Sequence, residues 1–397
     1  MAKTGFCDSK PLLDLPRKAE ERRAPLRTLP NTCGPKDRWQ SLEGDEPPGV
    51  PVKPEAEHRW DRRSSVSTRD GLMDCYEDDG RREDTVLFFS HGFPGPHSLQ
   101  TLVPSLLRHE VEVAMEKLNL ISDQTYGWEF FIDMMRNQLR NTFPSTDLPR
   151  PFTDTTRAIL VDWLIQVHEV LHFQDETLYL AVHLLNRCLR QIKVSTDNLQ
   201  LLGVVCLFLA AKKEECLLPE VSDLCYLMDN TYSKHQLLRM ERKVLCGLKF
   251  DLTYCPPLHF LLLSASIARC SAKVVWMARY LLELSLMESQ CVVFLPVQLS
   301  WAALCLARIL LQEPPSPEGE MAWCVASSIH MGSETTLLKI MHILAVAAAK
   351  AHSQETRATF IKFSSSVTMH VSTHPVLKNA QCHLGLSALH LTERITL

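Results

Sequence analysis

The sequence of 397 residues lacks the patterns that mark several common classes of protein. None of its 14 cysteines belongs to a CxxC pair, which argues against a zinc or disulfide framework and for buried thiols in a reducing compartment. No apolar run reaches the roughly 20 residues of a membrane span, and the N-terminus lacks the apolar centre of a signal peptide. The net charge of −4 provides no strong basic field for nucleic acid. We therefore expect a protein of the nucleus, the cytoplasm or both that binds neither nucleic acid nor membrane.

Residues 1–103 have the composition of a disordered region. Segments such as PRKAEERRAPLRTLPN and EPPGVPVKPEAEH combine proline with charges of both signs and contain few regularly spaced apolar residues. Such a segment cannot bury enough apolar surface to offset the chain entropy that folding removes. We expect this region to be disordered, and a linker with one helix to follow it at 104–152.

The stretch LQLLGVVCLFLAAKKEE at Leu199–Glu215 predicts a central helix. From Leu201 to Ala211 it has no charged residue, so this helix would be apolar on all sides and would need a shell of other helices around it. Eleven residues are too few for a membrane span, which needs about 20. The charged residues Lys212 to Glu215 follow without a spacer, which indicates a docking surface at the end of a buried helix.

Before this stretch, a helix is predicted at about 124–140, and three prolines within 141–152 end it. We expect its apolar residues to pack on the domain that follows. These residues are Tyr126, Phe130, Ile132, Met134 and Leu139.

From residue 153 to about 352, apolar residues recur at spacings of three and four, which indicates helices joined by short polar breaks. Two successive units of five helices are predicted, and the third helix of each is strongly apolar. The junction between them is marked by Pro256 and Pro257. The predicted fold is all-α, with domains at 153–252 and 253–352 and an extended tail at 353–397.

Several motifs occur in order along these helices. They are RAILVDWL (Arg157–Leu164), ETLYLAVHLLNR (Glu176–Arg187), LQLLG (Leu199–Gly203), AAKKEE (Ala210–Glu215), TYSKHQLLRMERKVL (Thr231–Leu245) and ELSLME (Glu283–Glu288). Over about residues 125–365 their order and spacing resemble the cyclin family, in particular two-box cyclins of the A and B types. The ECLLPE turn at Glu215–Glu220 is similar to the cyclin-P and cyclin-O branch. The resemblance implies two tandem cyclin boxes and a protein that needs no cofactor.

In that family, a lysine at the end of the third helix and a glutamate in the fifth form a buried pair that binds the backbone of a mobile kinase helix. The resemblance assigns these roles to Lys212 and Glu241; the alternative is an ordinary surface ion pair, worth about 0–1 kcal/mol. It also implies an apolar pocket for a side chain of that kinase helix, lined by Leu209, Leu245 and Leu252. Lys213 replaces the usual large apolar residue of one wall, and its charge has to reach water or a kinase carboxylate.

The resemblance implies a second surface, which binds Arg-x-Leu peptides of substrates. Its expected members are Ile159, Leu160, Trp163, Gln166, Leu199 and Gln200. Gln166 stands where the family has the acid that pairs with the peptide arginine, and Thr156 replaces the leading methionine, so weaker docking is expected. Arg157 and Asp162 are expected to brace the first helix, and Asn186 takes the place of an acidic brace in the second.

Within the N-terminal region, Arg23, Leu26 and Asn31 fall at positions 1, 4 and 9 of RAPLRTLPN. This is the spacing of a destruction box, an extended peptide that the ubiquitin machinery reads in mitotic regulators. The spacing alone is a weak signal. The cyclin resemblance strengthens the interpretation as a destruction box.

A rival motif, HEVLH at His168–His172, has the HExxH pattern of zinc peptidases. The extended form of that motif requires a histidine at position 178, which is a leucine, and apart from Glu176 no nearby helix offers a third ligand. The motif also falls inside the cyclin resemblance. We therefore reject a zinc site and expect two exposed histidines beside an apolar stripe.

These observations favour a non-catalytic subunit that binds and activates a cyclin-dependent serine/threonine kinase in cell-cycle control. The competing hypothesis is a cyclin-fold adaptor or scaffold that does not activate a kinase, which the residues at 156, 166 and 213 support.

Overall fold

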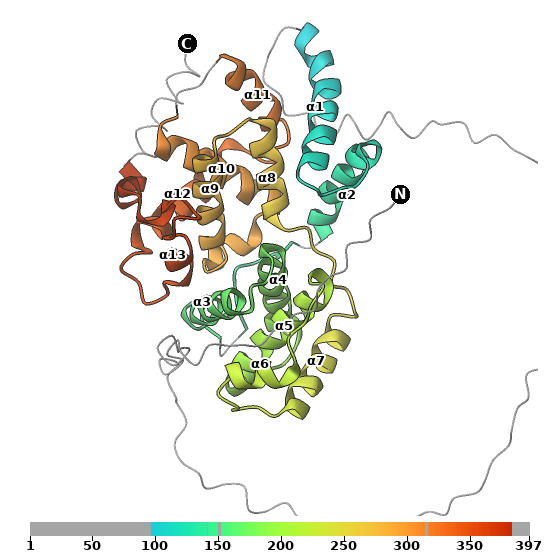
Figure 1. Cartoon of the computed structure of the whole chain (residues 1–397), viewed down its shortest axis with the longest axis vertical. Helices are drawn as coiled ribbons and strands as arrows, with labels where there is room; N and C mark the ends of the chain where they lie inside the picture. The colour runs from blue at the N-terminus through green and yellow to red at the C-terminus, as the bar shows by residue number, and fades with distance from the viewer. Residues whose placement is uncertain (1–96, 141, 150–151, 314–316, 383–397) are drawn as a thin grey trace, which may run out of the picture. The chain divides into compact units, whose positions relative to one another are not determined.

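The computed structural model describes residues 97–140, 142–149, 152–313 and 317–382 (Figure 1). Within these ranges the regular structure consists of helices, without a β-strand, so the all-α prediction is confirmed. In the same ranges, no helix combines the length and the apolar character that crossing a membrane requires.

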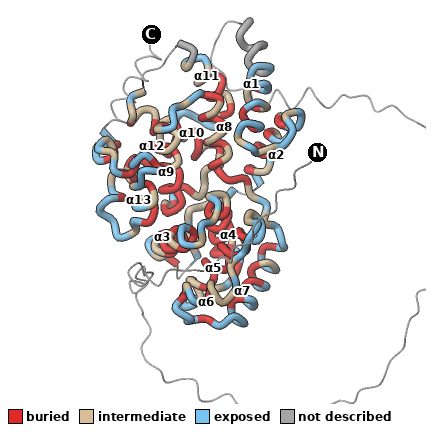
Figure 2. The backbone as a smooth tube through the Cα atoms, viewed as in Figure 1, coloured by how far each residue is buried: buried red, intermediate tan, exposed pale blue. Residues whose placement is uncertain are grey.

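The first five-helix unit is built around α5, which corresponds to the predicted central helix. α5 packs against α3, α4 and α7, and every residue from Leu201 to Ala211 is buried (Figure 2). A Cβ atom on Gly203 would lie 3.1 Å from Cδ1 of Leu160, so the glycine allows α3 to approach closely. The unit comprises α3 (Asp154–Leu171), α4 (Asp175–Gln191), α5 (Leu199–Glu214), α6 (Val221–Leu227) and α7 (Lys234–Gly247).

The second unit repeats this plan around α10. α10 packs against α8, α9 and α12, and its buried residues are apolar apart from Ser300. Pro257 and Pro296 begin α8 and α10 at the first helical turn, where a missing N–H costs nothing. The unit comprises α8 (Pro257–Ile267), α9 (Ala272–Leu284), α10 (Pro296–Leu311), α11 (Pro317–Ser327) and α12 (Glu334–Lys350).

The helix predicted at 124–140 is present as α2 (Gly127–Arg140), but its predicted buried side is only partly right: Met134 is buried and Ile132 is half-buried as expected. Tyr126, Phe130 and Leu139 are exposed, whereas Phe131 and Gln138 are buried. The buried residues of α2 follow a helical spacing of three and four. α2 packs against α1 (His97–Lys117), and Oε1 of Gln138 accepts a hydrogen bond from the backbone N–H of Val297 at the start of α10. α1 begins inside the segment that we expected to be disordered, and residues 1–96 lie outside the described part.

The extended tail expected from residue 353 is also wrong as far as residue 382, where the described chain ends. α13 (Ala358–Lys362) packs against α3 and α9, and Phe363, Val371 and Leu377 are buried. The backbone N–H of Ala358 donates to Oδ1 of Asp162 on α3 over 2.7 Å. The segment has no regular period because it is made of short helical turns, and tertiary contacts hold it in place.

A charge cluster that is buried or half-buried except at Glu169 connects α13 to both five-helix units. Nζ of Lys362 lies 3.1 Å from an oxygen of Glu169 on α3, 3.1 Å from one of Asp175 on α4 and 2.9 Å from one of Glu283 on α9. Arg279 also pairs with Asp175. Burial alone would lower the pKa of Lys362, but the carboxylates of Glu283, Asp175 and Glu169 raise it well above its usual value. Lys362 is therefore fully charged and neutralises acids from three helices.

His183, on α4, gives the fold a predictable sensitivity to acid. Its ring is 5% exposed and stacks on that of Tyr254 with centroids 4.1 Å apart, and burial lowers its pKa from 6.5 to about 3. Below pH 6.5 the unfolded chain binds a proton at this residue that the folded chain excludes, so stability falls as the pH decreases.

Between about pH 7.5 and about pH 5, this one residue is expected to remove about 2 kcal/mol from the free energy of unfolding. His183→Phe keeps the aromatic stack without the titrating ring, so urea unfolding of this variant should lose about 2 kcal/mol less over the same range. An equal loss in both proteins would contradict the assignment.

Candidate functional site

Lys212 and Glu241 meet at the C-terminal end of α5. Nζ of Lys212 lies 2.5 Å from Oε1 of Glu241 on α7 and 4.4 Å from the centre of the Phe208 ring. The side chain of Lys212 is 39% exposed and that of Glu241 is 11% exposed. The negative end of the α5 dipole favours a lysine at this position. The pair therefore combines the sheltered carboxylate of Glu241 with the ammonium group of Lys212, which an incoming molecule can reach.

The apolar residues assigned to the kinase pocket differ in their exposure. Leu209 is buried, and Leu245 and Leu252 are partly exposed. Phe250, which we did not predict, is 69% exposed, and its backbone N–H donates to the carbonyl of Leu245 over 2.9 Å. Its position just after α7 results from two successive residues with positive φ, Lys249 and Phe250, which end the helix. An aromatic residue in a short LKFDL segment is normally assigned to the core, so the sequence gave no sign of this exposure.

Lys213 lies at the surface beside the pair, where its ammonium group pairs with the carboxylate of the neighbouring Glu214. Its charge also acts on the buried thiol of Cys255, whose pKa burial raises to about 12, with Asp133 of α2 raising it further and Lys213 opposing the rise. Lys213 thus places a charged side chain where the cyclin resemblance implies one wall of an apolar pocket.

The loop after α5 exposes further apolar residues that we did not predict. Leu217 and Leu218 are 67% and 45% exposed. Glu215 turns away from them, because its Oε1 accepts hydrogen bonds from the backbone N–H of Gln174 and from Oγ1 of Thr177 at the start of α4. The ECLLPE turn therefore presents two leucines to solvent beside the lysine cluster.

The expected substrate-docking residues lie together on α3 and at the start of α5, and half of them are buried. Ile159, Gln166 and Gln200 are partly exposed. Gln166 donates to Oδ2 of Asp162 over 3.0 Å, so its amide is directed along α3. The buried members are Leu160, Trp163 and Leu199.

The three expected braces connect elements that are distant in sequence. The Arg157 guanidinium donates to Oδ1 of Asn186 over 2.7 Å and to the carbonyls of Leu286 and Met287 over 2.9 and 3.1 Å. Burial, with a contribution from Arg190, lowers the pKa of Arg157 to about 10. Burial also raises the pKa of Asp162, which holds the start of α13 as described above.

Comparison with known proteins identifies the family. Residues 128–253 match the family model described as "Cyclin, N-terminal domain", and residues 255–377 match the one described as "Cyclin, C-terminal domain". The chain belongs to the cyclin family. The second cyclin domain includes α13 and reaches beyond the boundary at 352 that we expected.

Two similar relatives are mitotic cyclins. The chain is 39% identical over 224 residues to G2/mitotic-specific cyclin-B2 of Rana japonica, which covers 56% of this chain and 55% of the relative. It is 36% identical over 241 residues to G2/mitotic-specific cyclin-B2 of Oryzias latipes, 60% of each chain. The chain thus spans less than two thirds of the length of these relatives. The crystal structure of a viral cyclin from herpesvirus saimiri matches with 18% identity and a TM-score of 0.46, over 55% of this chain and 97% of that one.

The resemblance to A- and B-type cyclins is therefore confirmed, whereas the narrower placement beside cyclin-P and cyclin-O stays a prediction. The degron residues Arg23, Leu26 and Asn31 lie outside the described residues, and their recognition by the ubiquitin machinery also stays a prediction.

The two histidines of the HEVLH motif do not share an exposed face, which differs from our expectation. His168 is 1% exposed and its Nε2 lies 2.8 Å from the carbonyl of Gln174, whereas His172 is an exposed cap with a φ of 53°. Glu169 pairs with Lys362 of the charge cluster. No group of three His, Cys, Asp or Glu suited to a metal ion occurs within the ranges that the structure describes. These three residues of the cyclin box have packing and pairing roles of their own.

Proposed function

We propose that this cyclin is a non-catalytic regulatory subunit that binds a cyclin-dependent protein kinase and shifts it toward its active arrangement during the cell cycle. The observation that carries the proposal is the half-accessible Lys212–Glu241 pair, together with the partly exposed Leu245 and Leu252 and the exposed Phe250. The similarity to G2/mitotic-specific cyclins supports the cell-cycle role.

The pair can recognise a backbone, because it offers both kinds of hydrogen-bonding group. An ammonium group carries three donors, and Glu241 uses one of the three on Lys212, which leaves two for a carbonyl of the partner. The second carboxylate oxygen of Glu241 can accept from a partner N–H. A kinase helix that presents such groups in one of its positions is bound more tightly in that position, and this difference in affinity moves the kinase equilibrium.

A panel of purified cyclin-dependent kinases, assayed on a generic substrate with and without the full-length chain, tests the proposal. We expect one or more kinases to be stimulated and to form a stable complex with the chain. Complex formation without stimulation would favour the alternative, a cyclin-fold scaffold, which the unusual residues Thr156, Gln166 and Lys213 support. Absence of any complex would contradict both.

Lys213 provides a test of the pocket itself. Lys213→Phe restores an apolar wall, so we expect it to tighten the complex with the selected kinase by about 1 kcal/mol, or about fivefold in Kd. Isothermal titration calorimetry measures this change directly. Lys339→Phe, an exposed lysine on α12, is the matched control and should leave Kd unchanged. Equal or weaker binding by Lys213→Phe would contradict our assignment of this wall.

A further inference from the structure

The outer face of α7 carries a stripe of four residues that the proposed kinase site does not use. His235, Leu238, Arg239 and Arg242 follow one another at helical spacing and line an open hollow of about 310 Å³. Leu238 is 42% exposed at its centre. We call these four residues the α7 strip.

The α7 strip has a positive charge that nearby acids do not neutralise. Among the residues that the structure describes, no carboxylate forms an ion pair with Arg239 or Arg242. The one acidic residue of α7, Glu241, is bound to Lys212. Lys243, on the same helix, is turned aside and donates to the carbonyl of Lys193 over 2.6 Å.

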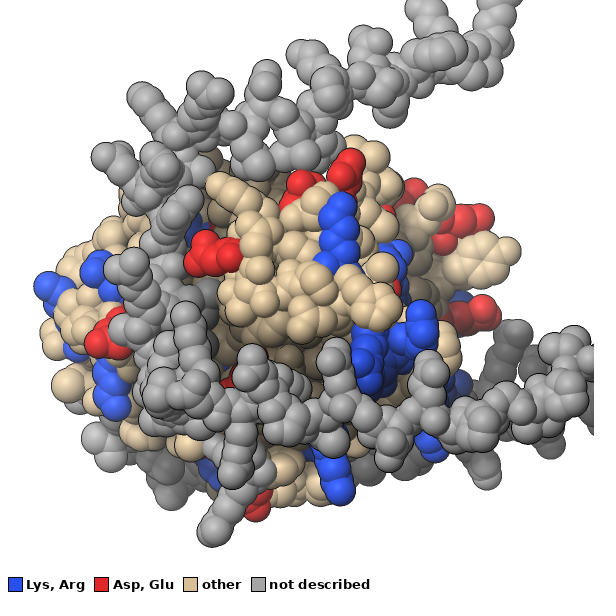
Figure 3. Space-filling view, turned by 90° about the horizontal axis from the view of Figure 1, so that it is seen from below, with Lys and Arg blue, Asp and Glu red and all other residues tan. Residues whose placement is uncertain are grey.

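The two arginines of the α7 strip differ from several other arginines of the described residues, which pair with acids. Arg108 pairs with Glu112, Arg187 with Asp251 and Arg279 with Asp175. The view of Figure 3, from the side on which α6 and α7 lie in Figure 1, shows lysine and arginine side chains gathered over part of the surface. Two unpaired guanidinium groups beside an exposed leucine attract acidic ligands and can bind their carboxylates in the two-pronged geometry that suits arginine.

We propose that the α7 strip binds an acidic segment of a partner protein, in which an apolar side chain lies between carboxylates. The apolar side chain rests on Leu238, and the carboxylates bind Arg239 and Arg242, with His235 at the end of the stripe. The seven helical steps from His235 to Arg242 span about 10 Å, which equals about three residues of extended peptide. A short stretch of alternating acidic and apolar residues therefore matches the strip in length and in charge.

This surface is separate from the kinase site, although both lie on α7. Glu241 points into the pair with Lys212 and is buried, whereas Arg239 and Arg242 are exposed. Binding at the α7 strip therefore does not require the Lys212–Glu241 pair, and the inference stands independently of kinase activation.

Fluorescence anisotropy with the full-length chain and the labelled peptide Gly-Ser-Asp-Glu-Leu-Glu-Asp-Ser-Gly tests the proposal. We expect Arg239→Gln combined with Arg242→Gln to weaken binding at least about tenfold, because two charge-assisted contacts are lost. Leu238→Ala should weaken it about threefold. Raising the salt from about 0.05 M to about 0.3 M should weaken binding to the wild type and have little effect on the double variant.

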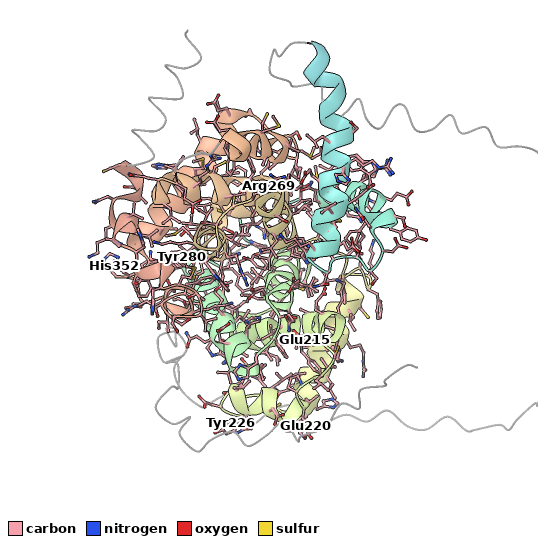
Figure 4. The ribbon with its side chains drawn as sticks, turned by 45° about the horizontal axis from the view of Figure 1, so that its top comes forward. Glu215, Glu220, Tyr226, Arg269, Tyr280 and His352 are labelled. Carbon is pink, nitrogen blue, oxygen red and sulfur yellow. The ribbon has the colours of Figure 1, made fainter. Side chains whose placement is uncertain are left out.

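Arg269→Gln combined with Lys378→Gln is the matched control, because it removes two exposed positive charges from the second cyclin domain. Figure 4 shows Arg269 far from Glu220, the N-cap of α6, and from Tyr226 in the last turn of α6, which is the neighbour of α7. This control and Lys212→Ala should both keep the affinity of the wild type within about twofold.

Three results would overturn the proposal. One is unchanged affinity in the Arg239 and Arg242 double variant, and another is an equal loss in the charge control or in Lys212→Ala. The third is tighter binding of a peptide in which asparagine and glutamine replace the acidic residues and one serine is phosphorylated. That result would identify the strip as a phosphopeptide site.

Discussion

Replacing Lys362 by methionine is expected to lower the free energy of unfolding by about 3–5 kcal/mol. The substitution keeps most of the side-chain volume but removes the cation that Glu169, Asp175 and Glu283 share. Glu283 suffers most, because its side chain is 2% exposed and burial already raises its pKa. Without Lys362 this carboxylate must stay charged in an apolar surrounding or take up a proton, and both carry a cost.

Urea unfolding at neutral pH measures this loss, and Lys378→Met, at an exposed lysine, serves as the control with a change of less than about 0.5 kcal/mol. Combining Lys362→Met with Glu283→Gln should recover part of the stability, because the stranded charge is then removed as well. A loss below about 1 kcal/mol in the single variant would mean that water reaches the cluster and screens it.

Replacing Lys212 by alanine is expected to weaken the complex with the selected kinase by about 2–5 kcal/mol, or at least about 30-fold in Kd. The substitution removes the two free donors of the ammonium group and also leaves the sheltered carboxylate of Glu241 without its partner. Most of the loss should appear as faster dissociation, since these contacts form after the two proteins have met.

Surface plasmon resonance gives both rates, and a double-mutant cycle with Glu241→Ala shows whether the two residues act together. We expect the double variant to bind about as weakly as either single one, because a pair that grips one backbone segment is lost when either member is removed. Lys339→Ala should bind like the wild type. Fully additive losses would mean that Lys212 and Glu241 contact different parts of the kinase.

The helical framework could be predicted because it depends on local pattern. The uncharged run from Leu201 to Ala211 requires burial on all sides, and the structure gives α5 that environment. The Lys212–Glu241 contact could be expected from the charges that follow this run together with the cyclin resemblance. The first inference uses spacing along one helix, and the second uses motifs on two helices, α5 and α7.

The features that were missed depend on contacts across long distances in sequence. The bond from Lys362 to Asp175 joins residues 187 positions apart, and no periodic pattern in the sequence predicts it. Tyr126 and Phe130 were placed inside by their apolar character, but the true inner face of α2 was set by contacts with α1 and α10. Phe250 is exposed because two left-handed residues end α7 there, and local composition does not encode that geometry.

The late position of Lys362 has a consequence for synthesis on the ribosome. Glu169 and Asp175 are made almost two hundred residues before their common counter-ion, and Lys362 lies more than one hundred residues beyond the first cyclin domain, which ends at residue 253. A nascent first box thus carries uncompensated acids until α13 has been made, which favours chaperone contact during that interval.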